Sequence, residues 1–297
     1  MKLKRKARLA VAAGLLAVML CMAVSALATT YVGQDPPASW AEKDVLKLTA
    51  IPIPYNDAAL LEVGGKSMLI DGGFCGRCYD LRDELTRLGH PGHVDVLFNT
   101  HPHEDHIGAV AYMLRYGWLT ADEFISCFSK NYSGEDNWQQ DTVHYLGMAG
   151  VPYVQLENGE TRDFGGAKLE FFWYPQAKDA NARSCQLKIT FGERSVLMMA
   201  DATRIAQEYY YKNTDAALLK ADILKYPHHA YNFMLNELLE KIDPDYVYIT
   251  NKKDKTPDTN KQLKRRKIPF NHTTIGPITM VTDGTDWYIH QTKGALW

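Results

Sequence analysis

The most constraining feature of the sequence is a short segment in which three histidines and an aspartate fall within six positions. Residues 100–108 read Thr-His-Pro-His-Glu-Asp-His-Ile-Gly, between a predicted buried strand, Val94–Phe98, and a predicted helix, Ile107–Tyr116. Histidines two positions apart in extended backbone project to the same side. Imidazole and carboxylate groups are ligands of Zn²⁺, Mn²⁺ and Fe²⁺, whereas a protein core has no use for four such groups in one loop. The segment therefore predicts a metal site in preference to a solvated, histidine-rich turn.

The first 28 residues are predicted to lie outside the folded domain. Five Lys and Arg residues precede an uncharged apolar run, Leu9–Ala28, which ends in the small-x-small pattern Ala26-Leu27-Ala28. This arrangement is typical of a cleaved secretory signal peptide. A run of about 20 residues is also long enough to remain as a membrane anchor. Both alternatives predict an exported protein, either secreted to the extracellular space or anchored with residues 29–297 outside the cell.

Charge argues against a protein that follows duplex DNA along its phosphates. The five basic residues of the leader leave 28 Lys and Arg against 35 Asp and Glu, a net charge of −7. Duplex-binding proteins usually have a basic balance, so any contact with nucleic acid has to be local. One basic stretch, residues 252–267, either meets phosphates or forms a solvated helix face.

Two of the five cysteines, Cys75 and Cys78, form a C-x-x-C pair in a predicted loop. A structural zinc site usually needs four ligands, and no second cysteine pair lies nearby in the sequence. Outside the cell the pair can form a disulfide, and free thiols are the alternative.

Hydrophobic periodicity predicts short strands interspersed with helices and no linker, so residues 29–297 are expected to form one domain. Strands grouped with helices in this way argue for a layered α/β sandwich. The predicted strands are 45–51, 58–63, 66–70, 94–98, 123–127, 153–156, 168–173, 185–191, 195–199, 246–250, 279–281 and 287–290, and the predicted helices are 79–88, 107–116, 138–146, 203–211, 236–242 and 260–266.

The H-x-H-x-D-H pattern of residues 101–106 resembles the signature of the metallo-β-lactamase superfamily. Three further segments are similar to motifs of that family in the same order: a strand that ends at Asp71 before two glycines, a strand that ends at Asp201, and Leu224–His229 after another strand. Ala200 stands where the family usually has glycine. The resemblance covers residues 49–290 and implies a four-layer αββα sandwich, which is an α/β fold.

One departure from the family pattern indicates a particular branch. Most members carry a further histidine, next to a glycine, between the long motif and the later aspartate, whereas this chain has Asn181-Ala182-Arg183-Ser184 at that place. This segment resembles the Asn-x-x-Ser of the hydrolase domain of ComEC-type competence proteins. That branch reads Lys-x-x-His-His-Gly-Ser at its last motif, and Lys225–His229 is similar, although Ala230-Tyr231 replace Gly-Ser.

The resemblance implies a role for each site residue and one or two Zn²⁺ ions as the cofactor, with Mn²⁺ or Fe²⁺ as alternatives. Without the additional histidine, the first metal has fewer protein ligands. The implied roles are metal 1 for His101 and His103; metal 2 for Asp105, His106 and His228; a bridge between the metals for Asp201; proton donor or alternative ligand for His229; orientation of a ligand for Asp71; and support around the metals, or plain loop positions, for Asn181 and Ser184.

These residues predict metal-dependent hydrolysis. A bound metal lowers the pKa of its water to about 7, and Asp105 or Asp201 would orient the resulting hydroxide for attack. His229 would protonate the leaving group. The ComEC-like resemblance implies a phosphodiester substrate, either nucleic acid or a phosphodiester of the cell surface, and no stable protein partner is predicted. The alternatives are hydrolysis of another ester, a thioester or a lactam, and a non-catalytic metal-binding protein that kept the fold.

Overall fold

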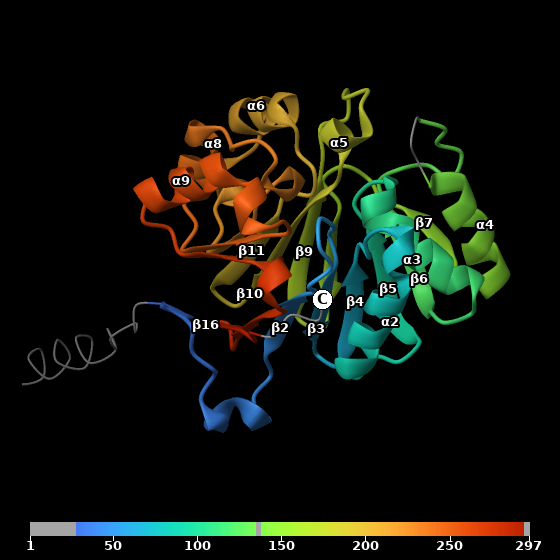
Figure 1. Ribbon diagram of the computed structural model, residues 1–297, viewed down its shortest axis with the longest axis horizontal. Helices are drawn as coiled ribbons and strands as arrows, with labels where there is room; N and C mark the ends of the chain where they lie inside the picture. The colour runs from blue at the N-terminus through green and yellow to red at the C-terminus, as the bar shows by residue number, and fades with distance from the viewer. Residues whose placement is uncertain (1–27, 135–137, 294–297) are drawn as a thin grey trace, which may run out of the picture.

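Two β-sheets lie face to face at the centre of the computed structural model, which describes residues 28–134 and 138–293 (Figure 1). Within these residues one sheet has nine strands and the other has seven. In spatial order, the first sheet contains β1 (Thr30–Val32), β16 (Trp287–Gln291), β15 (Ile278–Thr282), β2 (Leu46–Ala50), β3 (Ala59–Val63), β4 (Lys66–Ile70), β5 (His93–Asn99), β6 (Thr120–Ser126) and β7 (Tyr153–Gln155). The second contains β14 (Phe270–His272), β13 (Tyr246–Ile249), β12 (Ile223–Lys225), β11 (Arg194–Met198), β10 (Gln186–Phe191), β9 (Ala167–Phe172) and β8 (Thr161–Phe164).

Helices cover the outer face of each sheet, which completes four layers and confirms the predicted αββα sandwich (Figure 1). The first sheet is covered by α2 (Cys78–Arg87), α3 (Glu104–Arg115) and α4 (Gln139–Ala149); the second by α6 (Arg204–Asn213), α7 (Ala216–Leu219), α8 (Asn236–Ile242) and α9 (Pro257–Arg265). A short helix, α5 (Ala180–Arg183), precedes β10, and five short 3₁₀ segments span Ala38–Glu42, Cys75–Arg77, His228–Ala230, Lys253–Lys255 and Thr273–Ile275.

The central strands are apolar on both faces because each face packs against a different layer. In β4, Met68 and Ile70 enter the core between the sheets, whereas Leu69 packs under the helices of the first sheet. In β11, Leu197 packs under the helices of the second sheet, and its neighbours Val196 and Met198 face inward. This is the two-residue alternation of a strand, applied to a sheet that is buried on both sides.

Parallel pairing places the carboxyl ends of several strands at one edge of the sandwich. In the first sheet β4 pairs in parallel with β5, and in the second β11, β12 and β13 pair in parallel with one another. The two edges are joined where the amide of Cys185 donates a hydrogen bond of 2.9 Å to the carbonyl of Thr100. The loops that follow these strands therefore meet, at the position where open α/β sheets usually bind their ligands.

Every predicted strand and helix has a counterpart, but several boundaries differ. Helix α3, which the sequence predicts to begin at residue 107, begins at Glu104, so that Asp105 and His106 lie in its first turn. The last helix begins at Pro257 rather than at residue 260. Acidic side chains and proline are both favourable at a helix N-terminus, and this outweighs the apolar spacing on which the prediction relied. The strands β1, β8, β12 and β14 and the short helices α5 and α7 are absent from the predicted ranges, because three or four residues show too little periodicity.

Two further predictions concern the termini and the cysteines. Residues 1–27, which contain nearly all of the predicted leader, lie outside the described residues. No helix within 28–134 and 138–293 is both long enough and apolar enough to cross a bilayer. In these ranges the cysteines are free thiols, and the Sγ of Cys75 donates to Glu104 Oε1 over 2.8 Å. The structure thus has the free-thiol alternative at the Cys75 and Cys78 pair.

Removing an aromatic ring between the sheets should destabilise the whole fold. Phe171 packs edge-on against Phe98 of the opposite sheet, with ring centroids 5.2 Å apart. Phe171→Ala should lower the free energy of unfolding by about 3–5 kcal/mol, measured by guanidinium denaturation. Met148→Ala, at a residue that is 63% exposed on α4, should change it by less than about 0.5 kcal/mol. Equal effects of the two substitutions would contradict a core between the sheets.

Candidate metal centre

Side chains from distant parts of the sequence converge where the carboxyl ends of the parallel strands meet. Asp71 follows β4, His101 follows β5, and Asp201 follows β11. Asp105 and His106 enter from the first turn of α3, and His228 and His229 come three and four residues after the end of β12. The sheet register therefore brings together residues that are up to 158 positions apart in the chain.

Four of these residues form a compact group of possible ligands: Asp105, His106, Asp201 and His229 each offer one atom, and these atoms lie within 4.8 Å of one another. His106 Nε2 lies 3.2 Å from Asp201 Oδ1. His229 Nε2 lies 3.2 Å from Asp105 Oδ2 and 3.5 Å from Asp201 Oδ2. His106, Asp201 and His229 are buried, and the side chain of Asp105 is 38% exposed.

Unpaired buried atoms show that this group fits a cation. Among the residues that the structure describes, His106 Nε2, His229 Nε2 and Asp201 Oδ1 are buried and have no hydrogen-bond partner. An unpaired buried polar atom is costly, and native proteins leave few of them. Imidazole nitrogens and carboxylate oxygens aimed at one point are what a divalent first-row metal coordinates, so the donor set fits the expected cofactor.

A smaller set of donors lies beside the first. His101 Nε2 is also buried without a partner, and it lies 3.9 Å from Asp201 Oδ2. The His101 ring lies against both neighbouring rings, with centroids 4.0 Å from that of His106 and 4.7 Å from that of His103. His103 is half-buried. His101 and His103 therefore lie beside the four-residue group but are not part of it.

The structure places His229 in the four-residue group, which is the alternative ligand role that the resemblance implied for it, and leaves His228 outside that group. His229 is fully buried, whereas the side chain of His228 is 28% exposed and its Nε2 lies 3.8 Å from Asp201 Oδ2. The reason is the backbone, because His228, His229 and Ala230 have φ values of 50°, 47° and 60°. Three successive left-handed residues other than glycine are rare, and they turn the second histidine inward.

Each buried donor has a polar partner behind it. The Asp71 carboxylate accepts hydrogen bonds from the amide and the hydroxyl of Thr100 at 2.9 and 2.7 Å, and it lies 2.8 Å from His106 Nδ1. A proton held on Nδ1 leaves Nε2 of His106 facing the group. Ser184 Oγ accepts from the amide of Asp201 at 3.2 Å. The described hydrogen bonds of Asn181 stay within the α5 segment.

A buried charge network behind His229 was missed in the sequence. Asp57 Oδ1 lies 3.2 Å from His229 Nδ1 and accepts a hydrogen bond of 2.6 Å from Thr250 Oγ1. The Lys225 ammonium contacts the other oxygen of Asp57, donates to the carbonyl of Ala200 at 2.7 Å and lies 3.8 Å from Asp201 Oδ1. A charged side chain at the end of an apolar strand is a sequence signal that could have identified Lys225. Asp57 carries no such signal, because the residues around it are typical of a turn.

Paired charges control the pKa values in the ion-free site. Burial alone would lower the pKa of His106 and of His229. At His106 the negative charges of Asp201 and Asp71 outweigh burial, and at His229 those of Asp201 and Asp57 do so. Both pKa values are therefore raised well above the usual value. Burial, followed by repulsion from His106, lowers the pKa of His101. Burial opposes ionisation of Asp201 and is outweighed by His229 and His106, which hold its pKa well below the usual value.

Comparisons with known proteins agree with the architecture. A sequence profile described as Metallo-beta-lactamase superfamily matches residues 54–250, whereas a comparison with curated protein sequences finds no match. Among solved structures, CmlA, a diiron β-hydroxylase from Streptomyces venezuelae, is 16% identical with a TM-score of 0.52, over 83% of this chain and 55% of CmlA. The metallo-β-lactamase fold protein YhfI from Bacillus subtilis is 14% identical with a TM-score of 0.51, over 77% of this chain and 96% of YhfI. The chain thus spans about half the length of the hydroxylase.

Metal binding should release protons and strengthen as the pH rises. Because the pKa values of His106 and His229 are raised, both imidazoles carry a proton at neutral pH and must lose it to bind a metal. His101, with a lowered pKa, has none to lose. Calorimetric titration with Zn²⁺ at pH 7, in buffers of different ionisation enthalpy, should therefore detect release of about two protons per first ion bound. Binding without proton release would contradict this account.

The two adjacent histidines should differ sharply when each is removed. Losing a residue that only orients a ligand costs about 10–100-fold in metal affinity, so losing a ligand should cost at least as much. His229→Ala should therefore lower the affinity for Zn²⁺ by about 100-fold or more, whereas the matched variant His228→Ala should change it little. Competition with a chromogenic chelator measures both, and circular dichroism checks that both variants fold. The reverse order would assign the ligand to His228.

Proposed function

Because the chain belongs to the metallo-β-lactamase superfamily, we propose that it is a metal-dependent hydrolase whose principal ion is held by Asp105, His106, Asp201 and His229. The observation that carries the proposal is the convergence of buried, unpaired donor atoms from three of these residues, next to the partly exposed carboxylate of Asp105. In this site Asp105 is partly exposed to solvent, whereas the other three donors are enclosed by protein. Open coordination is what distinguishes catalytic from structural metal sites.

The expected cofactor is Zn²⁺, as one or two ions, with Mn²⁺ or Fe²⁺ as alternatives. Imidazole and carboxylate donors suit all three metals. When bound, the metal would lower the pKa of a coordinated water and stabilise negative charge on a reacting oxygen. His101 and His103, together with Asp201, are proposed to hold a second and weaker ion.

In the proposed mechanism, the protein supplies metal ligands that hydrogen bonds hold in place and one solvent-accessible base, Asp105. Asp71 orients His106, and Asp57 orients His229 while it is itself held by Thr250 and Lys225. Asp105 differs from the buried carboxylates because it is partly exposed. The neighbouring imidazoles of His229, 3.2 Å away, and His106 outweigh its burial and lower its pKa to about 2, so Asp105 is ionised at neutral pH and can accept a proton from the attacking water. His228 lies at the rim, and burial lowers its pKa, so at neutral pH it would contact a substrate as a neutral imidazole.

We propose a phosphodiester as the substrate class. The proposal is supported by the ComEC-like segments, Asn181–Ser184 and Lys225–His229. It is also supported by the absence, between His106 and Asp201, of the Gly-His motif that most of the family carries there. Export from the cell, with the domain either released or anchored, is proposed from the leader sequence. Other esters, thioesters and lactams are the alternative substrates, and a non-catalytic metal-binding protein is the alternative from a different class.

Hydrolysis is tested with three substrates in parallel: bis(p-nitrophenyl) phosphate, a chromogenic β-lactam and a thioester. The metal-loaded protein should hydrolyse the phosphodiester, and Asp105→Ala should lower the rate by about 100-fold or more, because general acid–base groups contribute about that factor. Asp83→Ala, at an exposed aspartate of α2, is the matched control and should keep full activity.

Three other results would each redirect the proposal. Bound metal without turnover of any substrate would favour the binding protein. Turnover of the β-lactam alone would reject the phosphodiester class. Full activity of Asp105→Ala would show that this carboxylate is not the base.

A further inference from the structure

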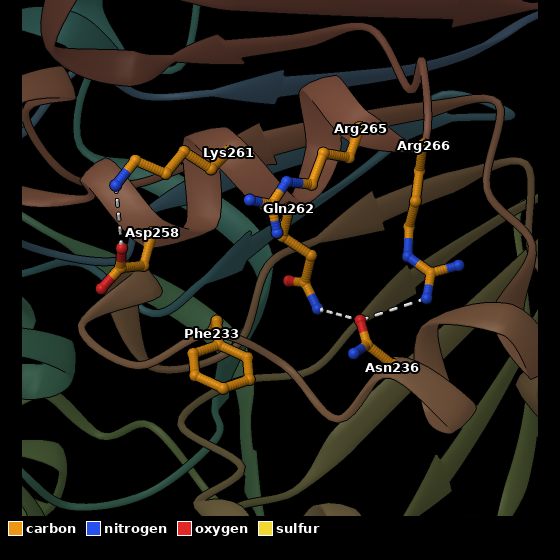
Figure 2. A pocket seen from close by; sticks show the side chains of 7 residues that line it. All are labelled: Phe233, Asn236, Asp258, Lys261, Gln262, Arg265 and Arg266. Carbon is orange, nitrogen blue, oxygen red and sulfur yellow. Dashed lines mark hydrogen bonds and ion pairs between the residues drawn. The ribbon is translucent and has the colours of Figure 1, made fainter.

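A basic cavity on α9 shares one lining residue with a second cavity, which is lined by His228 at the rim of the candidate metal centre. The first, of about 580 Å³, is lined by Lys261, Arg265 and Arg266 of α9, and Figure 2 shows the ring of Phe233 on its other side. The second, of about 480 Å³, is lined by His228 and again by Phe233. Phe233 therefore stands in the wall of both cavities, between α9 and His228, whose Nε2 lies 3.8 Å from Asp201 Oδ2.

The cavity on α9 carries free positive charge although the chain as a whole is acidic. Its lining contains three cationic side chains and one acidic residue, Asp258. Lys261 and Asp258 form an exposed pair at 3.6 Å, a kind of contact that contributes little. Arg266 is held by Glu240 at 2.8 Å and by Asn236 at 3.1 Å. Arg265 is exposed and makes no ion pair with any residue in the described ranges, so its guanidinium is available to an anion.

Buried hydrogen bonds fix this cavity relative to the metal centre. The amide nitrogen of Gln262 donates to Asn236 Oδ1 at 2.9 Å (Figure 2). It also donates to the carbonyl of Met234 at 2.7 Å, and the amide oxygen accepts from the Tyr226 hydroxyl at 2.7 Å. Met234 follows Phe233 directly, and Tyr226 lies three residues before His229. One hydrogen-bond network therefore fixes three segments relative to one another: α9, the segment that carries Phe233, and the segment that carries His228 and His229.

Phe233 itself is unusual for a surface residue. Its side chain is 51% exposed, and Tyr231 nearby in the sequence is 53% exposed. Exposed aromatic rings beside cationic side chains are the combination with which proteins bind single-stranded nucleic acid, because bases stack on the rings while Lys and Arg meet the phosphates. A phosphodiester chain without bases would have no use for the ring.

We propose that the cavity on α9 is a subsite for single-stranded nucleic acid, in which Arg265 and Lys261 bind backbone phosphates and Phe233 stacks on a base, while a neighbouring phosphodiester lies at the metal centre. This inference rests on the proposed function, since it names the substrate of that same site. It also gives the basic stretch of residues 252–267 a role that a solvated helix face would not have.

Binding is tested separately from cleavage with a fluorescently labelled phosphorothioate oligothymidylate of about ten nucleotides, a length within the range that single-strand-binding grooves span. Arg265→Glu should weaken binding about tenfold and make its dependence on salt shallower. Lys264→Glu changes the charge of the same helix equally, but Lys264 does not line the cavity, so it should change binding by less than about twofold. Phe233→Ala should weaken binding of the oligothymidylate about tenfold and leave an abasic phosphodiester chain of the same length unaffected.

Equal losses for Arg265→Glu and Lys264→Glu would overturn the subsite, because the effect would then be one of overall charge. Equal affinity for the abasic chain and the oligothymidylate would overturn nucleic acid as the ligand. Turnover of bis(p-nitrophenyl) phosphate without Arg265-dependent binding would overturn the subsite and leave the proposed hydrolase standing. Arg265-dependent binding without turnover would support the subsite and count against the hydrolase.

Discussion

The site depends on one buried anion, the carboxylate of Asp201. It is 2% exposed, and it is surrounded by His106 at 3.2 Å, His229 at 3.5 Å and Lys225 at 3.8 Å. A carboxylate without positive partners in such a place would cost several kcal/mol, so the chain has to bring those partners to it. It does so through sheet register, because β11 and β12 run in parallel and end at one edge, whereas His106 arrives from the opposite sheet. The core between the sheets and the charge cluster at their edge therefore stabilise one arrangement.

The segment after β12 carries backbone strain that its neighbours hold in place. Left-handed φ values at His228, His229 and Ala230 cost about 1–3 kcal/mol each. The Asn251 amide donates to the carbonyl of His229 at 2.9 Å, and the Thr259 hydroxyl donates to that of Ala230 at 3.4 Å. These two donors lie after β13 and on α9, so the direction in which His229 points is determined by elements on both sides. Strain maintained in this way is typical of functional sites, because it keeps a ligand oriented before the cation or the substrate arrives.

The sequence predicted the features that local patterns determine. The central strands were recognised because they are apolar and end in glycine or in polar residues, and the histidine segment because four ligands in six positions have no structural use. The choice between His228 and His229 was not accessible, since it depends on three backbone angles that no local preference of these residues favours. Asp57 was not accessible either, because only the fold places it behind His229. Lys225 was an available clue: a charge within an apolar strand requires a buried partner, and the structure supplies two.

Charge balance explains how the site can be formed before an ion arrives. Four carboxylates and one ammonium group, that of Lys225, surround the site. His106 and His229 add two positive charges before a metal binds, because their raised pKa values keep both imidazoles protonated. The carboxylates are those of Asp57, Asp71, Asp105 and Asp201. One divalent cation that displaces two protons leaves the net charge of the cluster unchanged, so the surrounding protein does not need to rearrange. A second ion beside His101 would find no proton to displace, because the pKa of that imidazole is already lowered, and it would add two positive charges to a smaller set of donors. The same electrostatics that would favour a first ion would therefore disfavour a second one.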